Sequence, residues 1–261
     1  MPWCDISTAA VIEENSQCNV QLISKDTGII AGLHVYKRVF ELLGKTEVKL
    51  YKNDGASVKN GEIIGELSGS TSIILSGERT ALNFLQRMSG IATLTSKFAY
   101  KLEGTNCRLL DTRKTTPGIR ILEKYAVKVG GGYNHRFNLS DGIMLKDNHI
   151  SAAGGVRNAV DMVRKNGCYG KQIEVEVESL AMVKEALEAS VDIIMLDNMS
   201  IETISEAVKI INKKAITECS GNVTLDTIAN IAATGVDYIS VGELTHSAKI
   251  LDFSMKNLVI N

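Results

Sequence analysis

From Lys171 to Val241, short apolar runs alternate with amphipathic stretches. The runs are IEVEVE, DIIML, AITEC and DYISV, and helices are expected between them from Leu180, Ile201 and Leu225. The second of these helices has its apolar positions on one face: Ile201, Ile204, Val208 and Ile211. Ser200 and Thr224 occupy N-cap positions. The alternation predicts an α/β fold with a parallel sheet or barrel.

A polar residue or a glycine ends each of these predicted strands. The residues are Glu176, Asp197, Ser220 and Gly242, at intervals of 21, 23 and 22 positions. The segments IMLKDN (143–148) and IMLDN (194–198) repeat one pattern, which assigns Lys146 to the same rim as Asp197. Because the carboxyl ends of parallel strands meet at one rim, where such folds carry their sites, we expect this rim to be functional.

The first hundred residues follow a different pattern. Strands are expected near 21–24, 48–51 and 63–67, with turns at 53–55 and 59–61. A long helix is predicted over 77–103, with Ser76 as its N-cap and Gly104 as its stop. The segment DGASVKNGEIIGELSG is similar to half of a biotinyl domain, but it has no Lys at a Met-flanked hairpin tip, so we interpret it as structural. This region is expected to form a separate α+β domain.

Composition narrows the class of protein. In 261 residues, 44% hydrophobic content supports a sizeable core, and only two Pro argue against disorder. The N-terminus lacks the pattern of a signal peptide, and no apolar run is long enough to span a bilayer. The five Cys are scattered without a C-x-x-C pair, which favours reduced thiols. We therefore expect a cytoplasmic protein without a membrane segment.

Charge is distributed unevenly, although the net charge is only −1 and gives no global field for nucleic acid. Residues 108–149 carry eight Lys or Arg against four acids, so this segment is +4 and the remainder −5. Its candidate cations are Arg113, Lys114, Arg136 and Lys146. Arg suits carboxylates and Lys suits phosphates, so the ligand is expected to be rich in both.

The acids at the strand ends require a cation, because an unpaired buried carboxylate is costly. For Glu176 and Asp197, one candidate is a Mg²⁺ ion that bridges pyrophosphate oxygens, and the alternative is structural ion pairing with Lys146 or Arg113. Glu174, Glu176 and Glu178 share one strand face by parity, so periodicity alone does not choose among these acids.

Glycine-containing loops follow the last two predicted strands. Residues 220–222 and 241–242 suit a phosphate site built from backbone N–H groups, although ordinary strand-to-helix turns have the same composition. His135 follows three glycines and is a candidate donor to an anion or a structural residue. Backbone hydrogen bonding explains His149 and His246, so neither is taken as a site residue.

Seven segments together resemble the quinolinate phosphoribosyltransferase family. In order between about Ser76 and Phe253 they are GERTALNFLQRMSGIAT, DTRKTTPGIR, GGGYNHRFNLSDGIMLKDNHI, IEVEVES, IIMLDN, SGNV and GVDYISVGELTHS. The first 75 residues match mainly in layout. The resemblance implies an open-faced, TIM-like α/β barrel over 105–249 and an N-terminal α/β sandwich domain over 1–104, joined by the segment 250–261. It also implies a homodimer with a shared site, and leaves assembly into hexamers open.

The resemblance also assigns roles to residues. Quinolinate carboxylates would be held by Arg79 of a neighbouring subunit, Arg113, His135, Arg136 and Lys146, with Thr112 and Lys114 completing the pocket. Glu176 and Asp197 would face ribose and Mg²⁺, and the phosphate would lie on Ser220, Gly221, Asn222, Val241, Gly242 and Glu243. Lys114, Lys146, Glu176 and Asp197 are the expected catalytic group. Cys219 beside the first loop and the carboxylate of Glu243 are departures from what a phosphate loop suggests.

The implied enzyme is a pentosyltransferase. It would transfer phosphoribosyl from phosphoribosyl pyrophosphate (PRPP) to quinolinate with decarboxylation, giving nicotinate mononucleotide, pyrophosphate and CO2 for NAD biosynthesis. It would need Mg²⁺ and no organic cofactor, because the ribosylated ring nitrogen itself stabilises the carbanion. The alternatives are a nicotinate salvage transferase, a molybdenum-transport-associated relative, and a non-catalytic barrel that binds a phosphorylated metabolite.

Overall fold

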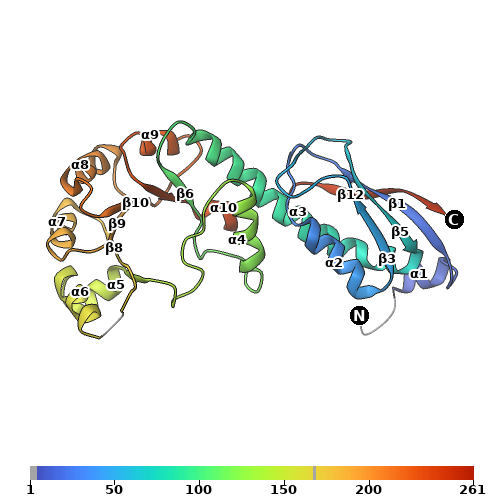
Figure 1. The fold of residues 1–261 in the computed structure, drawn as a ribbon, viewed down its shortest axis with the longest axis horizontal. Coiled ribbons are helices and arrows are strands. Elements are labelled where there is room, and N and C mark those ends of the chain that lie inside the picture. Colours follow the sequence, from blue (N-terminus) through green and yellow to red (C-terminus); the bar gives the residue numbers. More distant parts are fainter. Residues whose placement is uncertain (1–4, 167–168) are drawn as a thin grey trace. The chain divides into compact units, whose positions relative to one another are not determined.

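A computed structural model describes residues 5–166 and 169–261. The described chain forms two compact units. One contains the residues up to Ser96 together with 121–131 and 247–261, and the other contains 97–120 and 132–246. Each unit has its own sheet, and Figure 1 labels the elements of both.

The first unit is built on a four-stranded antiparallel sheet in the order β12-β1-β5-β3. The strands are β1 (Gln17–Ser24), β3 (Thr46–Leu50), β5 (Ile63–Ser70) and β12 (Phe253–Ile260), and a small pair is formed by β2 (Gly28–Ile29) and β4 (Ser57–Val58). The helices are α1 (Ile6–Val11), α2 (Leu33–Leu43), α3 (Thr71–Lys101) and α4 (Arg120–Val129). The core includes Leu22 of β1, Phe40 of α2, Leu67 of β5 and Leu85 of α3, all almost fully buried.

Helix α3 begins six residues earlier than the pattern predicts. Its first residue, Thr71, is buried, donates its backbone N–H to Ser16 O at 3.0 Å and exchanges a side-chain hydrogen bond with Ser16 Oγ at 2.8 Å. Gly77 therefore lies inside the helix, at a position where a Cβ would come within 2.8 Å of Phe40 and 2.9 Å of Leu43. The prediction of a start after Ser76 was wrong because tertiary contacts, and not a local cap, fix this end.

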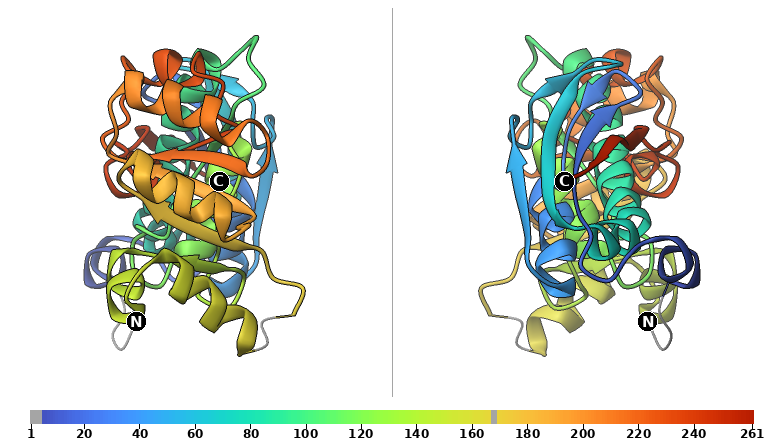
Figure 2. Two further views of the ribbon diagram at one scale, coloured as in Figure 1. Left: turned by 90° about the vertical axis from the view of Figure 1, so that its left-hand side faces the viewer. Right: turned by 90° about the vertical axis from the view of Figure 1, so that its right-hand side faces the viewer.

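The second unit is an open α/β barrel, so the α/β fold that the alternation predicts is confirmed, and so is the open form that the resemblance implies. Its six strands are all parallel, in the order β6-β11-β10-β9-β8-β7. They are β6 (Arg108–Leu110), β7 (Ile143–Leu145), β8 (Ile173–Val177), β9 (Ile193–Asp197), β10 (Ile216–Ser220) and β11 (Tyr238–Ser240). The helices are α5 (Asp147–Ala153), α6 (Val156–Lys165), α7 (Leu180–Glu188), α8 (Ile201–Ile211), α9 (Ile228–Ala232) and α10 (Glu243–His246), and α5 to α9 flank the outer side of the strands (Figures 1 and 2).

Helix starts in the second unit test the capping predictions. Helix α8 begins after Ser200, whose Oγ accepts the N–H of Thr203, so this cap is confirmed. Helix α9 begins only at Ile228, three residues later than expected. Thr224 Oγ1 instead accepts the N–H of Thr227 at 3.3 Å and closes a turn that precedes the helix.

Membrane segments and cysteine chemistry were the two remaining expectations. In the part that the structure describes, no helix combines the length and apolar character needed to cross a membrane. Cys18, Cys107 and Cys219 are buried free thiols, and burial raises the pKa of Cys107 and of Cys219 to about 12. Cys4 and Cys168 lie outside the described residues.

Candidate functional site

The carboxyl ends of the barrel strands carry a cluster of charged side chains. Lys146, directly after β7, donates to Glu176 Oε2 on β8 at 2.5 Å. Asp197, at the end of β9, is half-buried, and burial together with the charge of Glu176 raises its pKa above the usual range. These three side chains therefore form one ionic group at the rim, with two carboxylates that repel each other.

Asn198 joins this group to the loop after β10. Its Nδ2 donates to Asp197 Oδ2 at 2.7 Å, and its Oδ1 accepts from Asn222 Nδ2 at 3.0 Å. Its backbone N–H donates to Ser220 O at 3.0 Å. Gly221 has φ +94, and a Cβ there would overlap the Asn198 side chain, so only glycine fits this turn. The loop Ser220–Asn222 is thus held against the acidic end of β9.

Lys114 lies beside the loop after β11. Thr245 Oγ1 donates to Lys114 O at 2.8 Å, and a Cβ on Gly242 would come within 3.2 Å of Lys114 Cδ and 3.1 Å of His246 Nε2. The Lys114 amide also donates to Thr112 Oγ1 at 3.1 Å. The Asp-Thr-Arg-Lys segment and the second glycine loop are therefore neighbours, although about 130 residues separate them in the sequence.

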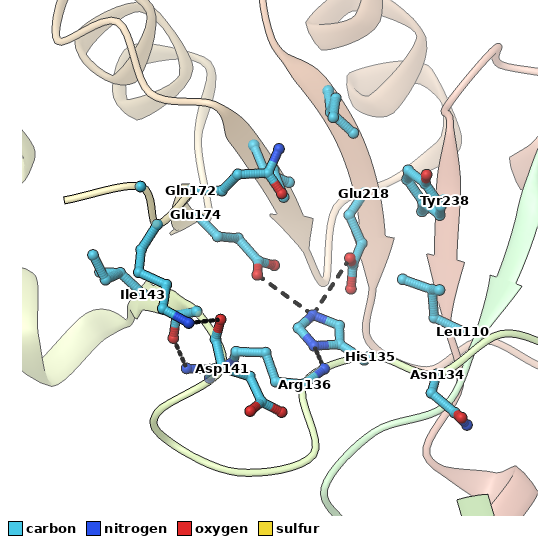
Figure 3. Close-up of a pocket in the computed structure, with 15 residues that line it drawn as sticks. Leu110, Asn134, His135, Arg136, Asp141, Ile143, Gln172, Glu174, Glu218 and Tyr238 are labelled. Carbon is cyan, nitrogen blue, oxygen red and sulfur yellow. Dashed lines mark hydrogen bonds and ion pairs between the residues drawn. The ribbon is translucent and has the colours of Figure 1, made fainter. Parts of the chain in front are cut away.

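A second group of ionisable side chains lies deeper, one pleat below the rim. Glu174 precedes Glu176 by two residues on β8, and Glu218 precedes Ser220 by two on β10, which is about 7 Å along each strand. Figure 3 shows both side chains pointing to the ring of His135. The His135 Nε2 atom lies 3.4 Å from Glu174 Oε2 and 3.6 Å from Glu218 Oε2.

Burial shifts the ionisation of this deep group. Glu174 and Glu218 are only 4% and 2% exposed, and the second oxygen of each, Oε1, is buried without a hydrogen-bond partner. Burial and the charge of Glu174 raise the pKa of Glu218 to about 7. Burial lowers the pKa of His135, but the hydrogen bond to Glu174 and the charge of Glu218 outweigh it, so that pKa is raised.

The backbone that carries His135 and Arg136 is anchored on both sides. The buried Asp111 accepts the His135 N–H and the Asn134 Nδ2, each at 2.8 Å. On the other side, the Arg136 N–H donates to His135 Nδ1 at 2.6 Å, and Arg136 Nη1 donates to Gly142 O at 2.9 Å. The His-Arg segment therefore has a defined conformation.

The guanidinium group of Arg136 lies near a second positive charge and has one unpaired nitrogen. Its Nε is buried without a hydrogen-bond partner. Burial and the nearby charge of Arg113 lower its pKa, while the charges of Glu174 and Glu218 act in the opposite direction. A bound anion would relieve the repulsion between the two guanidinium groups.

A cavity of about 420 Å³ adjoins this deep group, on the side of the amino ends of the strands. Four of its lining residues are the first of their strands: Ile143, Ile193, Ile216 and Tyr238. His135, Arg136, Glu174 and Glu218 also line it (Figure 3). The deep group thus separates the cavity from the rim.

Two sets of side chains are candidates for holding a cation. One ligand atom each from His135, Glu174 and Glu218 lie within 4.8 Å of one another, but an Nε2–H that faces two carboxylates explains that spacing without a metal. Glu176 and Asp197 fit Mg²⁺ better, because they are hard oxygen ligands, and burial together with the charge of Glu176 raises the pKa of Asp197.

The structure gathers most of the residues expected at the site into the second unit. Lys146 is hydrogen-bonded to Glu176, and Asp197 is linked to the loop 220–222 through Asn198. The charges of Glu176 and Lys146 act on Asp197, and Lys114 adjoins Gly242. Arg79 lies on α3 in the first unit and is exposed. Sequence reasoning missed Asp111, Asn198 and Glu218. Parity with Ser220 was the available signal for Glu218, and Asn198 stands next to an acid that had been selected.

Comparison with known proteins gives a consistent result over both units. Residues 5–89 match the family model described as quinolinate phosphoribosyl transferase, N-terminal domain, and residues 91–256 match that of the C-terminal domain. A probable nicotinate-nucleotide pyrophosphorylase [carboxylating] of Bacillus subtilis is 45% identical over 252 residues, which cover 96% of this chain and 87% of the relative. A mitochondrial quinolinate phosphoribosyltransferase [decarboxylating] of Nicotiana tabacum is 43% identical, over 97% of this chain and 77% of its own length.

Solved structures with similar folds include proteins of the same names. The crystal structure of NadC from Streptococcus pyogenes has a TM-score of 0.95 at 49% identity, covering 98% of this chain and 91% of that one. Nicotinate-nucleotide pyrophosphorylase from Ehrlichia chaffeensis has a TM-score of 0.93 at 37% identity, covering 98% and 92%. Human nicotinic acid phosphoribosyltransferase has a TM-score of 0.70 at 10% identity, over 97% and 72%, and shares the fold alone.

Proposed function

This chain belongs to the quinolinate phosphoribosyl transferase family, and from that premise we propose how its residues carry out the family's reaction. The reaction transfers phosphoribosyl from PRPP to quinolinate with decarboxylation, and gives nicotinate mononucleotide, pyrophosphate and CO2 in NAD biosynthesis. The observation that carries the assignment is the match of both family models, in order, over nearly the whole chain.

Quinolinate binds at the cationic group, with its two carboxylates facing Arg113, Arg136 and Lys146. The repulsion that lowers the pKa of Arg136 supports this, because a dianion would relieve it. Thr112 and Lys114 complete the pocket. The resemblance adds His135 to the carboxylate ligands, but its ring nitrogens face Glu174, Glu218 and the Arg136 N–H. Arg79 reaches it from the neighbouring subunit of a homodimer, which is consistent with its exposure on α3.

PRPP binds along the rim. Its 5′-phosphate lies on Ser220, Gly221 and Asn222 and on Val241, Gly242 and Glu243, where backbone N–H groups can donate to it. The close approach of Gly221 to Asn198 and of Gly242 to Lys114 supports a narrow cradle at these loops. Glu243, the first residue of the short helix α10, contributes its backbone and not its carboxylate.

Glu176 and Asp197 hold Mg²⁺, directly or through phosphate oxygens and water. When bound, the ion would neutralise charge on the departing pyrophosphate. The same carboxylates stabilise positive charge that develops on the ribose as the pyridine nitrogen attacks its C1 carbon. Lys146 donates to Glu176 and thereby holds that carboxylate in place for the ribose. No organic cofactor is needed, since the cationic ring nitrogen accepts the electron pair left by CO2.

The free, buried thiols of Cys18, Cys107 and Cys219 support a reducing compartment, the cytoplasm. A salvage transferase for nicotinate is the second candidate that shares this fold. The full cationic set disfavours it, because nicotinate has one carboxylate and quinolinate has two. A non-catalytic metabolite sensor would have no need for the paired acids Glu176 and Asp197.

Formation of nicotinate mononucleotide from quinolinate, PRPP and Mg²⁺ tests the function. Release of CO2 should match product formation one to one, and nicotinate in place of quinolinate should give little or no product. If the folded protein uses nicotinate and ignores quinolinate, the salvage function is correct. If it turns over neither compound, the sensor remains and the proposed reaction is wrong.

A further inference from the structure

The two deep acids have no place in the chemistry above, yet burying them is costly. Glu174 and Glu218 come from β8 and β10, which are separated in the sheet by β9, and both side chains converge on one ring nitrogen of His135 (Figure 3). Each keeps a buried oxygen without a hydrogen-bond partner. Buried carboxylates of this kind are destabilising unless a partner compensates them, so some benefit must offset the cost.

The other ring nitrogen of His135 shows what the acids are connected to. In the neutral imidazole with its proton on Nε2, His135 Nδ1 accepts the backbone N–H of Arg136 at 2.6 Å. A ring held at Nε2 by two acids therefore fixes the orientation of the acceptor that holds the Arg136 amide. The acids stand on rigid parallel strands, whereas the His-Arg segment is a connection that follows the glycines at 130–132. The chain of contacts runs from the sheet, through the imidazole, to Arg136.

We propose that Glu174 and Glu218 are positioning residues, which act through His135 to hold Arg136 in the orientation that binds a carboxylate of quinolinate. This inference rests on the proposed function, since it takes Arg136 as a quinolinate ligand. Neither acid touches the substrate. Their role is to set the geometry of a guanidinium fork, for which a shift of about 1 Å can cost about 100-fold.

The contacts also explain why two acids are needed. The Nε2 distances of 3.4 and 3.6 Å are nearly equal, so the ring lies between the acids and is not drawn to one side. With a single acid, the ring would be held at Nε2 from one side only. Asp111 accepts the His135 N–H and Asn134 Nδ2 at 2.8 Å, and Gly142 O accepts from Arg136 Nη1 at 2.9 Å, so the His135 ring is the support of Arg136 that leads to the two acids.

Steady-state kinetics of Glu174→Met and Glu218→Met test the proposal, with quinolinate and PRPP varied separately. Met keeps the side-chain length and removes the acceptor oxygens. We expect the quinolinate KM to rise about tenfold or more in each variant, and the PRPP KM to stay within about twofold. Glu174→Gln, which keeps an acceptor oxygen, should recover part of the loss. Glu178→Met is the matched control, because Glu178 is exposed just beyond the end of β8.

A double-mutant cycle separates positioning from general damage. If the acids act through the ring, Glu174→Met should have little further effect on the quinolinate KM in a His135→Ala background. An equal effect in both backgrounds, an unchanged quinolinate KM in both single variants, or a parallel rise in both KM values would each overturn the proposal. Failure of the proposed function looks different, because the wild-type protein would then not turn over quinolinate at all.

Discussion

Glu218 makes the stability of the barrel depend on pH in an unusual direction. Its pKa is raised from 4.5 to about 7 by burial and by the charge of Glu174. Below pH 4.5 the group is protonated in both folded and unfolded chains. Between pH 4.5 and 7 the unfolded chain releases the proton while the folded chain keeps it, so the free energy of unfolding falls as the pH rises.

The magnitude follows from the size of the shift. A difference of about 2.5 pKa units corresponds to at most about 3 kcal/mol, with the full loss reached above pH 7. The raised pKa of His135 acts in the same direction, because its stabilisation is present at low pH and is lost as the pH rises through the folded-state value. Glu218→Gln removes the first of these contributions and, because the charge of Glu218 helps to raise the His135 pKa, part of the second.

Urea unfolding at pH 5, 6, 7 and 8, followed by far-ultraviolet circular dichroism, measures the effect. Glu218→Gln and the wild type should have similar stability at pH 5, and the variant should gain up to about 3 kcal/mol relative to the wild type by pH 8. Glu178→Gln, at an exposed position of the same unit, should show the wild-type dependence. Parallel curves for Glu218→Gln and the wild type would refute the reasoning.

Three further predictions concern the rim and its loops. Lys146→Ala should lower kcat/KM for product formation by a factor that corresponds to about 2–4 kcal/mol of transition-state stabilisation. Lys171→Ala, at an exposed position before β8, should stay near wild type, and normal activity of Lys146→Ala would contradict its role. Gly221→Ala should raise the PRPP KM about tenfold or more, while Gly235→Ala should leave it unchanged, because Gly235 has a similar φ of +90 but its Cβ would make only an ordinary contact with Val208 at 3.7 Å; equal effects would assign the loss to backbone strain alone. Mixed dimers of Arg79→Ala and Lys146→Ala subunits should recover up to one intact site, and no recovery after proven mixing would exclude a shared site.

Strand ends were predictable because periodicity and chain polarity determine them. The spacing of Glu176, Asp197 and Ser220 places them at the carboxyl ends of parallel strands, and β8, β9 and β10 end at or one residue beyond these positions. The choice among Glu174, Glu176 and Glu178 was not available from parity, since all three share a face. The structure separates them by depth, with Glu174 buried, Glu176 at the rim and Glu178 exposed.

Contacts between distant segments account for what the pattern does not give. The start of α3 depends on Ser16, and the conformation of His135 depends on Asp111, Glu174 and Glu218, which lie 24, 39 and 83 residues away. A short stretch of sequence around Thr71 or around His135 does not include these contact partners. Glu218 could have been found by parity with Ser220, but its partner His135 lies on an irregular connection, to which no periodicity applies.

Three like-charged pairs among the described residues of this unit differ in what compensates them. Burial is the largest cause of each pKa shift, and next to it Arg113 lowers the pKa of Arg136, Glu176 raises that of Asp197, and Glu174 raises that of Glu218. In the proposed reaction, the dianion quinolinate would compensate the first pair and Mg²⁺ the second, and both ligands would come and go during turnover. The third pair faces His135, a group of the chain itself. Because its compensation does not depend on a ligand, the deep pair can keep one geometry through every step, and this constancy is what a support for Arg136 requires.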